Sequence, residues 1–247
     1  MDGIVIKIPI DQVINVFSVA ILLPLVFHLW RRTRENFTPS LSAFRWFFVC
    51  ILLMMTAFAT PFLIIKDLTL VQMSQNLAHF FFMAAVAFLL RSRTLLFGFH
   101  RRLFTFYTPV LILIIGAILF LWQINVLGPS IPTKVLTVGP LVFFDLWNSA
   151  PFLSNLIPGM IGFVIFATGT ILFFWTYFWT SEKILRRRSF FLGLGHFSAF
   201  IAVTIYFIAG QISGMVGLFT IAAIATMISI LLVYRGVLLP VLPREIT

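Results

Sequence analysis

Four polar side chains within the third apolar run of the sequence are the residues best suited to chemistry. Gln72, Gln75, Asn76 and His79 are spaced i, i+3, i+4 and i+7, which places all four on one face of a helix. At about 1.5 Å per residue, His79 lies about 15 Å below the outer end of that helix. The face predicts either hydrogen bonds between helices or an outward-opening pocket for a small amphipathic or lipid-like molecule. Polar residues of the sixth run lie at a comparable depth, so the candidate ligand-binding set is Gln72, Gln75, Asn76, His79, Tyr206 and Gln211.

Catalysis and cofactor binding have weaker support in the sequence. No Asp, Glu, Lys or Arg lies in the middle of an apolar run, and no Gly-x-Ser-x-Gly or His-Glu-x-x-His motif occurs. Buried ionisable groups are what ion-coupled transport needs, so we expect neither a pump nor an enzyme. Paired membrane histidines can ligate haem, but nothing in the spacing of His28 and His196 puts them at one level on opposing faces. We therefore predict no cofactor and no metal site.

The elements that carry these residues are membrane-spanning helices. The chain has 61% hydrophobic and 10% charged residues and a mean hydropathy of +1.11, whereas soluble domains are roughly half apolar and about a quarter charged. Seven apolar runs of about 20 residues occupy nearly all of the 247 residues, which indicates a single all-α membrane domain, 1–247. The predicted spans are 13–30, 41–65, 68–90, 105–122, 156–179, 190–211 and 215–234.

The distribution of positive charge predicts the orientation of the bundle. All but three of the 17 Lys and Arg residues fall in alternate gaps between the runs or in the C-terminal tail, the exceptions being Lys7, Lys66 and Lys134. Basic residues near spans are retained in the cytoplasm, so we expect an outside N-terminus and a cytoplasmic C-terminus. Gly, Pro and β-prone pieces between the fourth and fifth spans predict a small outer hairpin. The expected location is the plasma membrane, specifically a prokaryotic inner membrane.

The basic residues also form the largest polar surface that the sequence offers. They flank the spans and do not form a free basic arm, which favours anionic lipid headgroups over nucleic acid. We expect this face to contact membrane lipids and another membrane or cytoplasmic protein. The predicted docking residues are Arg31, Arg32, Arg34, Arg91, Arg93, Arg101, Arg102, Arg186, Arg187 and Arg188.

Three stretches give the chain the layout of a known sensor family. They are RRTRENF after the first span, GPSIPTKVLTVGPLVFFDLW after the fourth, and RRRSFFLGLGHFSAF at the start of the sixth. In layout the chain resembles the N-terminal seven-helix sensor region of bacterial histidine kinases. In that family the seventh helix continues into a cytoplasmic kinase, whereas this sequence ends at Thr247. The resemblance implies a sensor or receptor-like module that passes its signal to a separate partner.

Two other functions fit seven spans. The first is an auxiliary subunit of a larger membrane complex, which would dock through the basic face. The second is a small-solute facilitator similar to the SWEET carriers, in which two three-helix repeats flank a linker helix. The sequence contains neither a clear repeat nor the Pro-Gln dipeptide common among relatives of those carriers, which argues against the facilitator.

Overall fold

The computed structural model describes residues 8–60, 68–98, 101–126, 134–138, 141–145, 152–209 and 217–238. Within these ranges seven helices are long and apolar enough to cross a membrane, as the sequence predicts. The helices are α1 (Ile10–Glu35), α2 (Pro39–Ala59), α3 (Leu68–Leu96), α4 (Thr108–Val126), α5 (Phe152–Trp179), α6 (Lys183–Ala209) and α7 (Gly217–Leu238). The protein is therefore an all-helical membrane protein in its spanning part.

Several helices extend beyond the predicted spans into basic sequence. α1 continues through RRTRE to Glu35, α3 continues through RSRTLL to Leu96, and α6 already begins at Lys183. Arg, Lys and Glu are good helix formers, so the backbone hydrogen bonds continue after the apolar run has ended. The segment before the fourth helix contains the short π-helix η2 (Leu103–Tyr107), which leads directly into α4.

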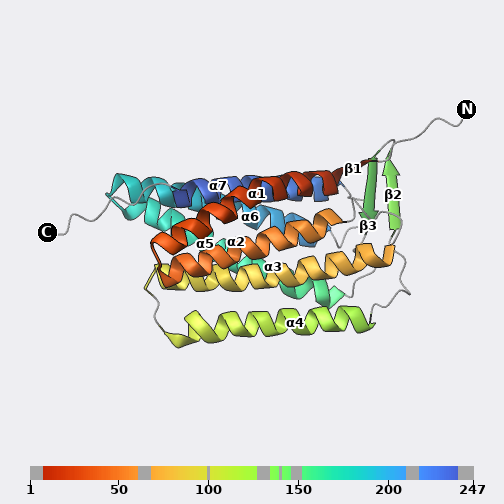
Figure 1. Ribbon diagram of the computed structural model, residues 1–247, viewed down its shortest axis with the longest axis horizontal. Coiled ribbons are helices and arrows are strands. Elements are labelled where there is room, and N and C mark those ends of the chain that lie inside the picture. The colour runs from red at the N-terminus through yellow and green to blue at the C-terminus, as the bar shows by residue number, and fades with distance from the viewer. Residues whose placement is uncertain are drawn as a thin grey trace, which may run out of the picture.

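Six of these helices form a closed ring, and the remaining one lies outside it. Packed neighbours follow the order α1, α2, α3, α5, α6 and α7, and α7 packs back against α1. α4 packs mainly on α3, along one edge of the bundle (Figure 1). The ring therefore surrounds an interior region with helices on its lateral sides.

The two ends of the bundle differ in composition. Figure 1 shows the short strands at one end of the bundle and the C-terminal turns of α7 at the other. The C-terminal end also carries the end of α1, the start of α2, the end of α3 and the turn between α5 and α6. The predicted inner bases within the described residues belong to these segments, to residues 101–102 before the fourth helix, to the first turns of α6 or to the end of α7. We call this the basic end, and the opposite one the strand end.

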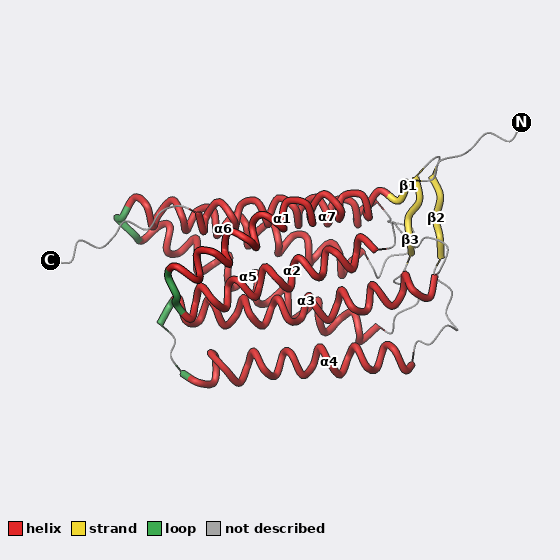
Figure 2. Tube along the Cα trace, in the orientation of Figure 1, coloured by secondary structure: helices red, strands yellow, loops and turns green. Residues whose placement is uncertain are grey.

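The strands form a small sheet in the order β1, β3, β2 (Figure 2). β2 (Lys134–Val138) and β3 (Leu141–Asp145) are antiparallel, with Lys134 opposite Asp145. Both fall in the segment for which the sequence predicts a hairpin. β1 (Ile8–Pro9) adds to β3 in parallel. No local pattern predicts this third strand, because it pairs with residues far along the chain.

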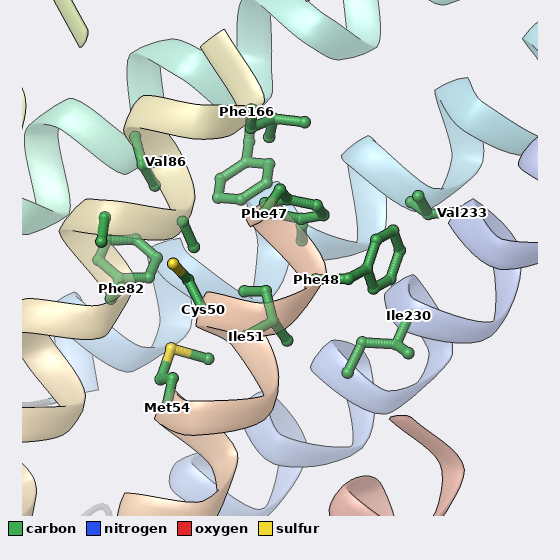
Figure 3. Packing of buried hydrophobic residues seen from close by; sticks show 14 of the residues in the cluster. Phe47, Phe48, Cys50, Ile51, Met54, Phe82, Val86, Phe166, Ile230 and Val233 are labelled. Atoms are coloured by element: carbon green, nitrogen blue, oxygen red, sulfur yellow. The ribbon is translucent and has the colours of Figure 1, made fainter. Parts of the chain in front are cut away.

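The apolar core lies around α3, the most enclosed of the spans. In α3, 72% of the most apolar 18-residue stretch is buried, whereas in each of the other six described spans the corresponding share is 50% or less. Aromatic side chains fill the space between α2, α3, α5 and α7, among them Phe47, Phe48, Phe82 and Phe166 (Figure 3). α6 and α7 pack closely because Gly195 has no side chain: an added Cβ would lie 2.5 Å from Val233 Cγ2.

Candidate functional site

An elongated cavity lies inside the ring of six helices. The space open to atom centres inside it is about 160 Å³. α1, α2, α3, α5, α6 and α7 all contribute lining residues, and α4 contributes none among the described residues. The cavity is therefore a property of the whole ring.

Only part of the predicted polar face of α3 lines this cavity. Gln75 and His79 line it, and Phe82 continues the same row. Asn76 is equally buried but does not line the cavity. Gln72 is half-buried and does not line it either. Because successive residues turn by about 100° around a helix axis, positions i, i+3, i+4 and i+7 cover a broad arc. Only one side of that arc faces the cavity, so two of the four residues line it and two do not.

The sixth helix supplies the next predicted lining residue. Tyr206 lines the cavity and accepts a hydrogen bond from Gln75 Nε2, with 3.5 Å between nitrogen and oxygen. His79 lies among aromatic rings, its centroid 6.2 Å from that of Tyr206 and 6.4 Å from those of Phe58 and Phe207. The other predicted residue, Gln211, lies outside the described residues.

Two polar lining residues of α1 were missed by the sequence analysis. Gln12 and Asn15 are buried and line the cavity together with Ser74 and Gln75 of α3. The sequence interpretation started the first span at Val13, which left Gln12 in the preceding tail. Their i, i+3 spacing is the signal that would have found them, because it puts both side chains on one helical face once α1 begins at Ile10.

Aromatic and aliphatic side chains make up most of the remaining lining, together with Thr226 and Ser229, whose hydroxyls donate to Ala222 O and Gly195 O. Phe48 and Ile51 of α2, Phe166 of α5 and Val233 of α7 line this part, and Figure 3 shows them converging from different helices. The lining contains no Asp, Glu, Lys or Arg among the described residues. The cavity is thus amphipathic, with most of its uncharged polar groups towards the strand end and mainly hydrocarbon towards the basic end.

Arg93 departs from the prediction that it docks lipid or a partner. Its side chain is buried and reaches across to α5, where Nη1 donates to Ile165 O at 2.6 Å and Nη2 donates to Thr168 Oγ1 at 3.0 Å. Burial of a guanidinium demands such partners. Arg93 therefore joins α3 to α5 and is not part of the docking surface, which corrects the prediction.

Two other predicted docking residues also bind within the protein. Arg32 Nη1 donates to Val237 O at 2.8 Å, and Arg188 Nε donates to Gly236 O at 3.2 Å. Both cations therefore lie at the C-terminal end of α7, where unpaired carbonyls and the helix dipole favour positive charge. The remaining predicted docking residues have exposed side chains at the basic end: Arg31, Arg34, Arg91, Arg101, Arg102, Arg186 and Arg187.

The two histidines considered for haem do not share a site. His28 is exposed on α1, whereas His196 is 2% exposed inside the bundle. His196 Nδ1 donates to Leu192 O at 2.8 Å. Within the described ranges no three His, Cys, Asp or Glu side chains cluster in a way that could hold a metal ion.

No protein-family model matches the chain, and no curated protein matches it either. Its function therefore has to be argued from the cavity and the basic end.

Proposed function

We propose that this protein is a receptor-like membrane protein that binds a small amphipathic molecule in the central cavity and signals to a separate partner. The cavity inside the six-helix ring carries the proposal. It combines buried hydrogen-bonding groups at one end with an aromatic and aliphatic wall along the rest, which is how small-molecule sites are generally built. Among the residues that the structure describes, no catalytic constellation accompanies it, so the proposed role is binding without reaction.

The position of the cavity supports transmission of a signal. Every ring helix lines it, including α7 from Phe219 to Val233. The far end of α7 is bound by Arg32 and Arg188 at the basic end. A ligand that favours one arrangement of α7 shifts the population of that arrangement. Occupancy would then change the shape of the surface to which those arginines belong.

The proposed partner binds at the basic end. Exposed guanidinium groups of the α3, η2 and α6 ends, such as Arg91, Arg101 and Arg187, offer positive charge to anionic lipid and to an acidic partner surface. By the charge rule this end faces the cytoplasm and the strand end faces outward. We accordingly place the protein in the plasma membrane, and in a prokaryotic inner membrane in particular.

The test is whether a small molecule occupies the cavity in native membranes. Ala222 and Ala223 line the cavity on α7, so Ala222→Leu or Ala223→Leu fills it. We expect mass spectrometry of the purified protein to find an amphipathic molecule in near-stoichiometric amount with the wild type and at least tenfold less with either variant. Ala225→Leu, on the same helix but outside the lining, is the control and should retain it.

The opposite result would reject the receptor. If the wild type and both filled variants carry the same bound molecules in the same amounts, the cavity is not a ligand site. Fixed-stoichiometry purification with a large membrane complex that is unaffected by cavity filling would favour the auxiliary subunit instead.

A further inference from the structure

The cavity contains two buried acceptor oxygens that point to the kind of ligand it takes. Gln12 and Gln75 are 7% and 8% exposed. Oε1 of each is buried, and within the described part of the chain neither has a hydrogen-bond partner. A buried carbonyl oxygen without a donor costs about 1–3 kcal/mol. Both residues line the same cavity, so a bound molecule is well placed to supply the missing donors.

The charge of the lining restricts the ligand further. The described lining residues are polar or apolar but none is Asp, Glu, Lys or Arg. A charged group that moves into such an interior loses its hydration, and without a counter-charge nothing offsets this free-energy cost. An uncharged headgroup avoids this cost and can still satisfy Gln12 and Gln75.

The shape of the cavity restricts the ligand to one chain. On α7 the lining runs from Phe219 to Val233, a length of about 21 Å for 14 steps of 1.5 Å. A volume of about 160 Å³ spread over about 21 Å leaves a mean cross-section of about 8 Å² for atom centres. That cross-section accommodates one hydrocarbon chain and excludes two lying side by side.

We propose that the cavity binds an uncharged, single-chain amphipath whose headgroup donates hydrogen bonds to Gln12 and Gln75. Hydroxyl or primary amide headgroups have this chemistry, whereas simple esters and ketones, which only accept, do not. The inference rests on the proposed receptor function and specifies its ligand class. The chain lies along the aromatic wall, with its end near Phe48 and Val233.

The test compares four probes that share an oleyl or oleoyl chain. The full chain in lipid nanodiscs is titrated with 1-monooleoylglycerol, which is uncharged and carries two hydroxyls. Methyl oleate lacks a donor, oleyl sulfate is an anion, and 1,2-dioleoylglycerol has a hydroxyl but two chains. We expect saturable binding of tritiated 1-monooleoylglycerol, with each of the other three competing at least tenfold more weakly.

Variants connect this preference to the named residues. Gln75→Met keeps the length of the side chain but removes the acceptor, and Gln12→Met does the same on α1. Each should weaken 1-monooleoylglycerol binding about tenfold, the order of one hydrogen bond to a desolvated partner, while leaving methyl oleate unchanged. Asn76→Leu, equally buried on α3 but off the cavity, should bind like the wild type.

The outcomes separate this inference from the receptor proposal. Equal binding of methyl oleate, oleyl sulfate or dioleoylglycerol, or wild-type binding by both methionine variants, would overturn the ligand class. In that case the receptor stands if Ala222→Leu still abolishes the binding. If no probe binds the wild type saturably, neither proposal survives for amphipaths of this length.

Discussion

At the scale of single residues, Gly169 of α5 has the least room for a side chain among the described glycines. A Cβ added there would lie 2.4 Å from Cδ2 of His196 and 2.8 Å from Nη1 of Arg93. Both side chains are buried and held by hydrogen bonds to backbone carbonyls, so neither can move aside without losing a partner. Glycine at this position is what lets α3 and α6 both approach α5.

Substituting this glycine should therefore destabilise the protein. For Gly169→Ala we expect a loss of about 1–3 kcal/mol, the range for overpacked interiors, seen as a lower Tm in thermal unfolding of the purified protein. Gly193→Ala is the control, because its added Cβ would meet only the ring of half-buried Phe174 at 3.2 Å. Equal Tm values for the two variants would contradict this account.

Even a conservative substitution of Arg93 should destabilise the protein. Its planar guanidinium reaches Ile165 O and Thr168 Oγ1 at once, and a lysine ammonium cannot match that fork. We expect Arg93→Lys to cost about 1–3 kcal/mol of stability, the order of one lost hydrogen bond from a charged group. The same change at Arg91, exposed two residues earlier, should leave Tm unchanged. The pair is compared in one unfolding series, and equal effects would refute the role of Arg93.

At the scale of elements, the end of α7 depends on two other helices. Its carbonyls at Gly236 and Val237 accept from Arg188 of α6 and Arg32 of α1. Removing both donors, as Arg32→Met and Arg188→Met, should let the last turn fray. We expect amide hydrogen exchange over residues 234–238 to accelerate about tenfold, about 1.4 kcal/mol of lost protection. Arg187→Met, which is exposed, should have no such effect.

Displacing α4 from α3 should leave ligand binding in the cavity intact. It packs mainly on α3, where an added Cβ at Gly116 would lie 2.8 Å from Cβ of Met83. Gly116→Leu should therefore push α4 away from α3 and lower Tm by the equivalent of about 1–3 kcal/mol. Amphipath binding in nanodiscs should persist, because no described residue of α4 lines the cavity. Loss of binding in a folded variant would show that α4 supports the ring.

At the scale of the whole molecule, the separation of charge between the two ends predicts a definite orientation. Cys50 is the chain's single cysteine and is buried, so Cys50→Ala provides a background for labelling. In intact cells a membrane-impermeant maleimide should label Lys134→Cys, in β2 at the strand end. It should label Arg34→Cys, at the basic end, only after the membrane is opened. The reverse pattern would invert the proposed orientation.

The architecture could be predicted from the sequence because its determinants are local. Apolar runs of about 20 residues suffice for membrane helices, whatever their neighbours are. The helix ends were less predictable, as at Glu35 and Leu96, since hydropathy marks the apolar run and not the last hydrogen-bonded turn. The pairing of β1 with β3 depends on residues distant in sequence, so no local pattern reveals it.

The candidate site could be predicted only in part, because it depends on packing. The period of α3 identified Gln75 and His79 but could not distinguish them from Asn76, which lies on the same broad face. Arg93 looked like its exposed neighbour Arg91, and only the proximity of α5 buries it. Gln12 required knowledge of where α1 begins. Which side of a helix faces a cavity is decided by the helices around it.

The enclosure of α3 has a consequence for how the chain is made. α3 is the least apolar of the seven described spans and also the most enclosed. A segment with Gln75, Asn76 and His79 enters hydrocarbon less readily than its neighbours when alone. We therefore expect α3 to leave the translocon paired with α2, already synthesised and its closely packed neighbour. The polar face of α3 would then be covered by protein from the moment the helix enters the bilayer.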